Sequence, residues 1–557
     1  MPPTANGLAR ANRPGSLNRR PKIVLRPKSI EARSSRFLRA TILRRTLFAF
    51  VVLGMIWRVA RFAGGPPLWG DEAFLAVNLL TRNFVGLLQP LDYFQIAPAG
   101  FLGAERLVVD LLGRSEWSLR LIPFLSGLFA LGLFARFASK VADRRSALFA
   151  VAIFAASYYP VRHATEVKPY ATDLLAAMIT LGLAWSLRLD RDSIARWVGF
   201  TLWVAVGLWC SYPLVFVVAG MGSVLAIEIV RQPSRRSLFG LQMFLLVSAS
   251  SFLLSYWMVA GPQSKAAPFY SELKTWQGAF PPLDRPWLIP YWLLDVHTGN
   301  MLAYPDGGPH FGSLATALLV LSGARALRRS RPALLALLLS PLVPMLLASC
   351  LQRYPYGTSA RTTLFMAPSF CLLAGIGLTR LIRRFRGARR VRLYRLSILS
   401  LGGMILVAIV GNLAWPYKNY EDLLNRRAIE HLAELARPGD VWLFDDGVET
   451  LPVSKGLMLE HWLQQMAEVR YNVLARAPVP VFMTHGPESA QAAPSGRTWL
   501  IVHQSGSPAF DQARLTRFRQ SLDDRLGPPR VRVERMTRGE SIESYEYPAP
   551  ASPSTGR

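Results

Sequence analysis

Long apolar runs alternate with short basic clusters over the first three quarters of this chain. Eleven runs lie between residues 46 and 415, and a helix needs about 20 apolar residues to cross a bilayer. One soluble core cannot bury this many all-apolar helices, so the pattern predicts an α-helical polytopic membrane protein. The predicted spans are 46–63, 119–138, 146–161, 169–187, 197–211, 213–230, 238–259, 311–327, 332–350, 362–379 and 396–415.

The basic clusters predict which ends of the spans face the cytoplasm. Short cytoplasmic loops of membrane proteins carry an excess of Lys and Arg. Such clusters occur at 10–45, 136–145, 188–196, 231–236, 325–331 and 380–395. With all of them inside, the eleven spans place the N-terminus in the cytoplasm and the C-terminus outside. We therefore expect a multi-pass protein of the plasma (inner) membrane.

The first external loop, residues 64–118, contains a further apolar run at 98–112. Glu105 and Asp110 interrupt this run, and a span here would move the next basic cluster to the outer side. We therefore predict surface helices at 72–88 and 98–112, which lie against the membrane within this loop.

The residues after 415 lose the membrane pattern. Helical spacing at 420–435 is followed by strand-like runs at 441–444, 479–483, 499–502 and 530–547. The sequence thus predicts four parts: a basic, disordered cytoplasmic segment (1–45), a transmembrane domain (46–415), a small α/β extracytoplasmic domain (416–547) and a disordered tail (548–557).

The formal net charge of +29 belongs to the membrane part. Residues 416–557 hold 17 Lys/Arg and 18 Asp/Glu, so the whole excess lies before residue 416. A high pI is typical of nucleic-acid-binding proteins, but here the charge lies in the clusters between spans, where topology explains it. Nucleic acid is therefore excluded as a partner, and the lipid bilayer is expected instead.

Two adjacent acids, Asp71 and Glu72, follow the first predicted span. Acids near the hydrocarbon boundary carry a desolvation cost. They could stabilise the N-terminus of the helix that begins there. Alternatively, one of them is a general base that takes the proton of an attacking hydroxyl. The sequence alone leaves both interpretations open.

A second polar cluster occupies the short outer turn before the fourth predicted span. It contains Glu166, Lys168 and Tyr170, and Asp173 lies one turn into the span. Glu166 and Lys168 could be a surface ion pair, which is worth little. A buried acid, a lysine and a tyrosine at one helix entrance favour a binding site, in which Lys168 would hold a phosphate.

Five motifs carry a resemblance to a known family. They are Asp71-Glu72, the run PLDYFQIAP at 90–98, the run SEWSLRLIP at 115–123, the run EVKPY at 166–170, and YPYG at 354–357 with Arg361 and Pro368. In this order and on one predicted side, they resemble motifs of the GT-C membrane glycosyltransferases. That superfamily includes the protein O-mannosyltransferases and the lipid A aminoarabinose transferase. The resemblance spans residues 47–415, with Lys168 where many members have Arg.

The resemblance implies a glycosyltransferase with a polyprenyl-phosphate-sugar donor and a glycan, lipid or protein acceptor that enters from outside. Asp71 is the implied base, and Glu72 is its neighbour and an acceptor contact. Lys168 and Arg361 are implied phosphate contacts. The implied sugar or supporting contacts are Glu166, Tyr170, Asp173, Tyr93 and Gln95. One displacement with a carboxylate base would invert the anomeric centre.

Two questions stay open at this point. No cofactor is implied with certainty; some relatives use a divalent metal, for which Glu105, His163 and His297 are the candidates here, without tight ligand spacing. A transporter or flippase of lipid-linked saccharides is the alternative function, and a membrane scaffold that presents the C-terminal domain is another. Transporters carry ionisable residues deep within several spans and internal repeats, which this sequence lacks.

Overall fold

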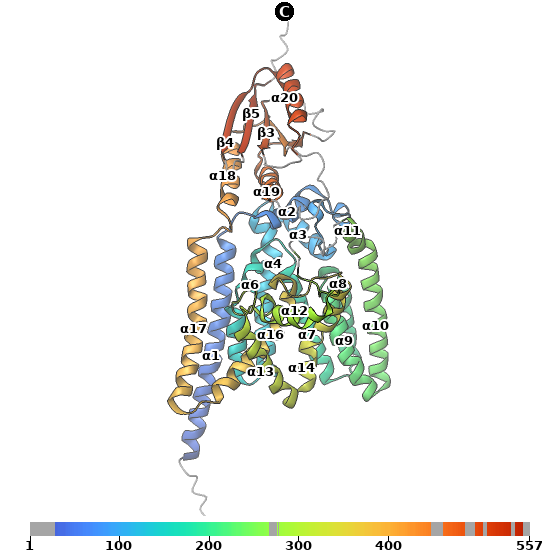
Figure 1. Ribbon diagram of the computed structural model, residues 1–557, viewed down its shortest axis with the longest axis vertical. Helices are drawn as coiled ribbons and strands as arrows, with labels where there is room; N and C mark the ends of the chain where they lie inside the picture. The colour runs from blue at the N-terminus through green and yellow to red at the C-terminus, as the bar shows by residue number, and fades with distance from the viewer. Residues whose placement is uncertain are drawn as a thin grey trace, which may run out of the picture.

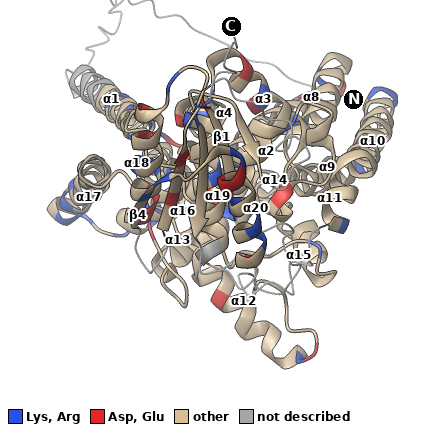
Figure 2. Ribbon diagram, turned by 90° about the horizontal axis from the view of Figure 1, so that it is seen from above, with Lys and Arg blue, Asp and Glu red and all other residues tan. Residues whose placement is uncertain are grey.

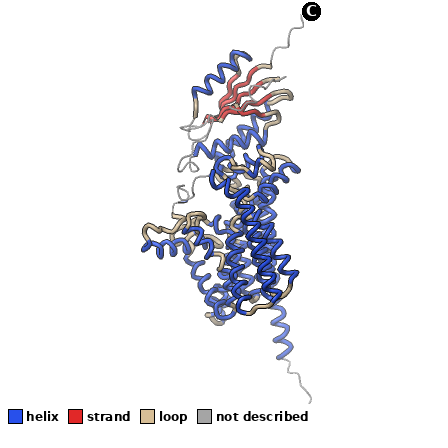
Figure 3. The backbone as a smooth tube through the Cα atoms, turned by 90° about the vertical axis from the view of Figure 1, so that its right-hand side faces the viewer, coloured by secondary structure: helices blue, strands red, loops and turns tan. Residues whose placement is uncertain are grey.

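The computed structural model describes residues 28–266, 276, 278–446, 461–484, 496–504, 510–535 and 541–549. A bundle of long helices forms one end of the molecule, and a small α/β domain stands on the other end (Figure 1). Short helices of the segment 70–112 lie between these two layers (Figure 1), and the side view also shows helices between the bundle and the sheet (Figure 3).

The helices of the bundle follow the apolar runs. Within the described residues, eight segments are long and apolar enough to cross a membrane, and Ile194–Cys210 is a shorter apolar helix. The predicted multi-pass helical fold is thereby confirmed, while the number of eleven spans stays a prediction. The bundle helices are α1 (Lys28–Ala63), α4 (Glu116–Val141), α5 (Arg144–Ala155), α7 (Tyr170–Leu189), α8 (Ile194–Cys210), α9 (Leu214–Arg231), α10 (Arg235–Ser255), α13 (Leu314–Ser330), α14 (Pro332–Leu339), α15 (Leu342–Cys350), α16 (Ala367–Arg383) and α17 (Gly387–Ala414).

Helix α1 begins earlier than the apolar pattern indicates. It starts at Lys28, so part of the segment predicted to be disordered is helical. Arg and Lys are good helix formers, and a continuous helix needs no break where its apolar stretch begins. Residues 1–27 and 550–557 lie outside the described part of the chain.

The segment between α1 and α4 contains helices in the two places where the sequence predicts them. They are α2 (Gly70–Thr81) and α3 (Ala99–Leu112), joined through short 3₁₀ turns at Gly86–Leu88 and Asp92–Phe94. Further short helices on this side of the bundle are α6 (Tyr158–Arg162), α11 (Gly261–Ala266) and α12 (Ile289–Thr298).

The C-terminal domain is a five-stranded mixed sheet with the strand order β2-β1-β3-β5-β4. Strand β1 pairs in parallel with β2 and β3, and β5 pairs antiparallel with β3 and β4. Its strands are β1 (Val441–Asp445), β2 (Val481–Met483), β3 (Thr498–Gln504), β4 (Arg530–Arg535) and β5 (Ser541–Tyr547), and its helices are α18 (Tyr420–Leu435), α19 (His461–Arg476) and α20 (Gln512–Leu526).

Alternation along β1 divides the domain into two cores. Trp442 and Phe444 pack in one cluster with residues of α18 and α19, whereas Val441 and Leu443 pack with residues of α20 on the other face. This is the period-two pattern of a strand buried on both faces. The predicted α/β character of this region is confirmed.

Helix α19 also packs against α2. Leu463 and Met466 of α19 share one buried cluster with Ala73 and Phe74 of α2. The C-terminal domain and the segment between α1 and α4 therefore share a hydrophobic core, which holds the domain on the bundle.

Two buried carboxyl groups lie at this junction. Asp422 of α18 and Glu468 of α19 are almost fully buried and hydrogen-bond to each other. Burial raises the pKa of Asp422 to about 6. Burial and then the charge of Asp422 raise the pKa of Glu468 well above its ordinary value. The folded pair thus retains a proton at a pH where separate carboxyl groups would have lost it.

The junction should therefore be more stable in mild acid. A carboxyl group whose pKa is raised by folding stabilises the protein below its ordinary pKa, and this stabilisation is lost as the pH rises through the folded value. We expect the melting temperature to fall as the pH is raised from about 5 to about 8. In Glu468→Gln this slope should flatten, whereas Glu434→Gln, an exposed change on α18, should keep it. Equal slopes in wild type and Glu468→Gln would contradict the assignment.

Candidate active site

Glu72 is a buried anchor at the start of α2. Its carboxylate accepts hydrogen bonds from Arg120 Nε at 2.8 Å and Arg120 Nη2 at 2.7 Å. The backbone N–H of Val167 also donates to Glu72 Oε1, at 2.9 Å. Arg120 further donates to the carbonyl oxygens of Pro66 and Pro67. One carboxylate thus joins α2, α4 and the outer turn before α7.

Asp71, the adjacent residue, points to a different set of partners. Its Oδ1 lies 3.0 Å from Lys168 Nζ, and its Oδ2 lies 3.0 Å from Arg361 Nη1. Burial alone would raise the pKa of Asp71, but the charges of Lys168 and then Arg361 outweigh it and lower that pKa. Asp71 is therefore ionised at neutral pH, and its side chain keeps 21% of its surface exposed.

The two cations that hold Asp71 come from distant parts of the chain. Lys168 Nζ also donates to Gln95 Oε1 at 2.6 Å. Arg361 lies in the 3₁₀ turn that precedes α16, with its guanidinium carbon 4.9 Å from the centre of the Trp276 ring. The structure thus brings together four residues that the sequence singles out: Asp71, Gln95, Lys168 and Arg361.

Glu166 lies beside this group but is engaged with other partners. Its oxygens bond to Arg162 Nε at 2.6 Å and His163 Nδ1 at 2.7 Å. Burial would raise the pKa of Glu166, but His163 and Arg162 lower it well below its usual range. Tyr170 packs edge-on against His163, with ring centres 4.9 Å apart. Asp173 is buried one turn into α7, and its Oδ1 has no hydrogen-bond partner within the described residues.

Tyr93 is directed towards the C-terminal domain. Its ring stacks on Phe74, and its hydroxyl accepts from Arg470 of α19 at 3.4 Å. Burial raises the pKa of Tyr93 to about 12. The structure therefore places Tyr93 in contact with Phe74 of α2 and Arg470 of α19, whereas Gln95 contacts Lys168.

The metal candidates are not brought together. Glu105 is buried in α3 without a hydrogen-bond partner among the described residues, and burial raises its pKa well above the ordinary value. His163 is bound to Glu166, and His297 bonds to the Leu293 carbonyl and contacts the Tyr356 hydroxyl. In the described part of the chain, no three His, Cys, Asp or Glu side chains are placed to hold one metal ion.

Gly70 is a feature that the sequence motifs did not identify. A Cβ at this position would lie 2.4 Å from Gln464 Cβ of α19, so only glycine allows this approach. The backbone N–H of Gly70 donates to Glu468. Gly70, the residue before Asp71, is therefore held in place by helix α19 of the C-terminal domain. We call this contact the clamp on Gly70. A glycine directly before two acids was the only signal of this contact in the sequence.

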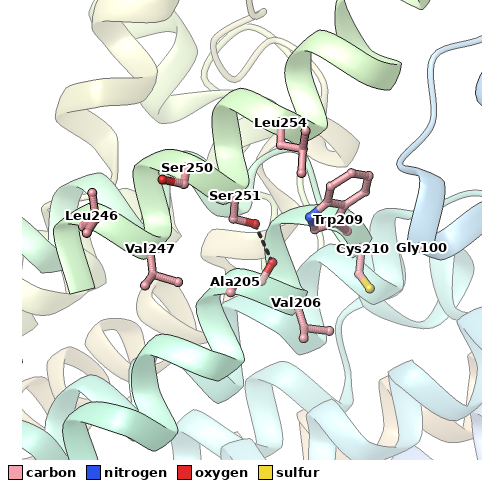
Figure 4. Close-up of a pocket in the computed structure, with 10 residues that line it drawn as sticks. All are labelled: Gly100, Ala205, Val206, Trp209, Cys210, Leu246, Val247, Ser250, Ser251 and Leu254. Carbon is pink, nitrogen blue, oxygen red and sulfur yellow. Dashed lines mark hydrogen bonds between the residues drawn. The ribbon is translucent and has the colours of Figure 1, made fainter. Parts of the chain in front are cut away.

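An apolar groove of about 690 Å³ lies between α8, α10 and the start of α3 (Figure 4). Val206, Trp209, Leu246 and Leu254 line it, and the Ser251 hydroxyl donates to the Ala205 carbonyl across it at 2.7 Å. Gly100, which also lines the groove, is five residues after Gln95. The groove therefore lies only five residues along the chain from Gln95, which contacts Lys168.

Comparison with known proteins shows similarity in sequence and in fold. The family described as dolichyl-phosphate-mannose-protein mannosyltransferase matches residues 101–257. The crystal structure of ArnT from Cupriavidus metallidurans bound to undecaprenyl phosphate is similar over 89% of this chain and 97% of that chain, with 15% identity and a TM-score of 0.51. The chain has the GT-C glycosyltransferase fold. The expected resemblance and the expected enzyme class are confirmed.

Other solved structures align less well. ArnT from the same organism in the apo state gives a TM-score of 0.48 at 14% identity, over 89% of this chain and 97% of that chain. The oligosaccharyltransferase AglB from Archaeoglobus fulgidus, in complex with an inhibitory peptide and a dolichol-phosphate, gives 0.44 at 11% identity, over 78% and 64%. Among curated proteins, none matches this chain.

The close contact between Gly70 and Gln464 predicts that the C-terminal domain stabilises the start of α2. In Gly70→Ala the added methyl group must displace α19 or the start of α2, because it would overlap Gln464. Overpacking of this kind costs about 1–3 kcal/mol. We expect a lower melting temperature, which Gln464→Ala should partly restore in the double variant. Gly103→Ala, where a Cβ meets nothing within 4 Å, is the control. A wild-type melting temperature in Gly70→Ala would show that the clamp is absent.

Proposed function

We propose that this protein transfers a sugar from a polyprenyl-phosphate donor to an acceptor hydroxyl on the extracytoplasmic side of the inner membrane. The N-terminus is then cytoplasmic, and the C-terminal domain is outside. The single observation that carries the proposal is the pairing of Asp71 with Lys168 and Arg361, both at 3.0 Å. This pairing places one base, Asp71, beside two cations, Lys168 and Arg361.

The chemistry requires these two parts together. The acceptor oxygen forms a bond to the anomeric carbon, the bond from that carbon to the phosphate oxygen breaks, and the acceptor proton passes to Asp71. Lys168 and Arg361 stabilise the charge of the departing phosphate, so no acid needs to protonate it. A single displacement inverts the anomeric centre.

The cations also control the base. In the free enzyme they hold the pKa of Asp71 low, which makes its carboxylate a weak base. When a donor phosphate binds Lys168 and Arg361, its negative charges compete with Asp71 for them. The basicity of Asp71 then rises when the donor is bound. Asp71 is therefore a stronger base in the donor complex than in the free enzyme.

The neighbouring residues receive different roles in this proposal. Glu72 positions Asp71 through Arg120, and its three hydrogen bonds leave little capacity for an acceptor contact. Gln95 orients Lys168. Tyr170 and Asp173 remain candidate sugar contacts, and Glu166 keeps Arg162 and His163 in place beside them.

The apolar groove suits the carrier's hydrocarbon chain. The stretch from Gln95 to Gly100 leads from Lys168 towards the groove. It is fixed at Ala97, whose backbone N–H donates to Gln263 Oε1 and whose carbonyl accepts from the Tyr212 hydroxyl. Five residues span at most about 18 Å. The ArnT structure with the similar fold carries undecaprenyl phosphate, which supports a carrier of this class.

The proposal is tested by replacing the base. In cells that carry Asp71→Asn, we expect loss of one glycan-modified product, which mass spectrometry of the lipids and glycans would identify by comparison with wild type. The amide cannot accept the proton, so the rate should fall by about 10²–10⁴-fold, while protein amount and folding stay unchanged. Full product in a folded Asp71→Asn protein would remove Asp71 as the base.

The groove gives a second test. Val206→Trp should fill part of it and weaken the use of long-chain donors, raising their KM by about tenfold, with little change for donors of short chain. Leu202→Trp, one turn away on α8, has the same exposure of 61% and lies outside the groove, so it serves as the control. An equal KM for long-chain donors in both variants would contradict the assignment.

A further inference from the structure

A second cavity, of about 300 Å³, lies beside the Asp71–Glu72 motif. Its walls come from the last turn of α1, from the turn around α6 and from the segment that joins α17 to α18. Helices α1 and α17 run side by side below it (Figure 1). Trp69 and Glu72 line this cavity, whereas Asp71, Lys168 and Arg361 do not. The cavity is therefore separate from the donor phosphate site proposed above.

The cavity has an excess of positive charge. Its two acids are neutralised: Glu72 by Arg120, and Glu166 by Arg162. Two further cations, Arg61 and Lys418, also line it. Within the described residues neither has a carboxylate partner: Arg61 Nε donates to the Thr165 hydroxyl at 2.7 Å, and Lys418 Nζ lies 2.8 Å from the centre of the Trp69 ring.

The charged form of Lys418 is disfavoured where it lies. Partial burial and then the charge of Arg162 lower the pKa of Lys418 to about 8. Unpaired cations close together in a partly closed cavity are costly unless an anion joins them. The structure thus contains a charge imbalance that a ligand would relieve.

A buried hydrogen-bond donor, the indole N–H of Trp69, also indicates a missing ligand. The indole N–H of Trp69 is buried and has no acceptor among the described residues. Buried polar groups normally have a hydrogen-bond partner. An indole N–H, a guanidinium and an ammonium are all donors, so the absent partner must offer several acceptor oxygens. A phosphate group has this chemistry and suits Arg and Lys together.

The cavity lies where the membrane spans end. The candidate spans stop at Ala63 and Ala414, and Tyr158, Trp415 and Tyr417 line the cavity. Trp415 is 65% exposed, and Trp and Tyr gather at the level of lipid headgroups. We propose that this cavity binds a phosphate group through Arg61, Lys418 and Trp69, at the level where lipid phosphates lie. The proposal does not depend on the transfer reaction.

Calorimetric titration of the full-length protein in a neutral detergent tests this site. The probes are dioctanoyl phosphatidylglycerol, inorganic phosphate and, as the zwitterionic control, dioctanoyl phosphatidylcholine. We expect wild type to bind at least one of the first two probes, and Arg61→Gln with Lys418→Gln to weaken that binding by about tenfold or more, since two charge-assisted contacts are lost. Lys168→Gln removes a donor-site cation and should leave this binding in place. Arg427→Gln, at an exposed position of α18, is the matched control.

The outcomes separate the sources of the phosphate. A loss confined to phosphatidylglycerol supports a lipid headgroup, and a loss for both probes supports a site open to soluble phosphate as well. Lys418→Gln alone, at an exposed side chain, keeps the test valid if the double variant does not fold; it should weaken binding by about threefold or more. Wild-type affinity in the variants, no binding by wild type, or loss in Lys168→Gln instead would overturn the proposal.

Discussion

The buried ion pair between Glu72 and Arg120 is the constraint on which the site depends. It connects α2 to α4, and the bond from Val167 adds the turn that carries Lys168. Removing one partner of a buried pair costs about 3–5 kcal/mol, since the other charge is left unpaired. Successive residues of a helix point about 100° apart. Once Glu72 is fixed against Arg120, Asp71 must therefore point in another direction, towards Lys168 and Arg361.

The C-terminal domain takes part in the same arrangement. Seen from above, its helices and strands lie over the centre of the bundle (Figure 2). Helix α19 contacts α2 through Leu463 and Met466, and it meets Gly70, the residue before Asp71. The Asp71-Glu72 motif is thus held on one side by Arg120 and on the other by α19. Loss of the domain would expose the apolar face of α2, so the domain is structural support for the site.

Much of the fold follows from periodicity. The apolar runs predict the bundle helices, and the strand-like runs predict the C-terminal sheet. A helix is also present at α3, where the sequence predicts one that does not cross the membrane. These features depend on local patterns, which a sequence displays directly. The start of α1 at Lys28 was missed, since a helix can continue through a polar segment without any change in apolar pattern.

The division of roles within the site could not be predicted from the sequence. Asp71 and Glu72 have similar chemistry, and only the distant Arg120 decides which of them is buried. Tyr93 and Gln95 are two residues apart, yet one contacts Arg470 and the other contacts Lys168. The approach of Lys418 to Trp69 joins segments more than 300 residues apart. Such contacts depend on tertiary packing, which no local motif encodes.

The central claim is that Asp71 and a donor phosphate share the cations Lys168 and Arg361. It is tested most directly by measuring the dissociation constant of polyprenyl phosphate for purified wild type and Asp71→Asn. Because asparagine no longer neutralises the two cations, the account predicts that the variant binds the phosphate at least as tightly as wild type while transfer is abolished. A large loss of phosphate binding in a folded Asp71→Asn protein would contradict it.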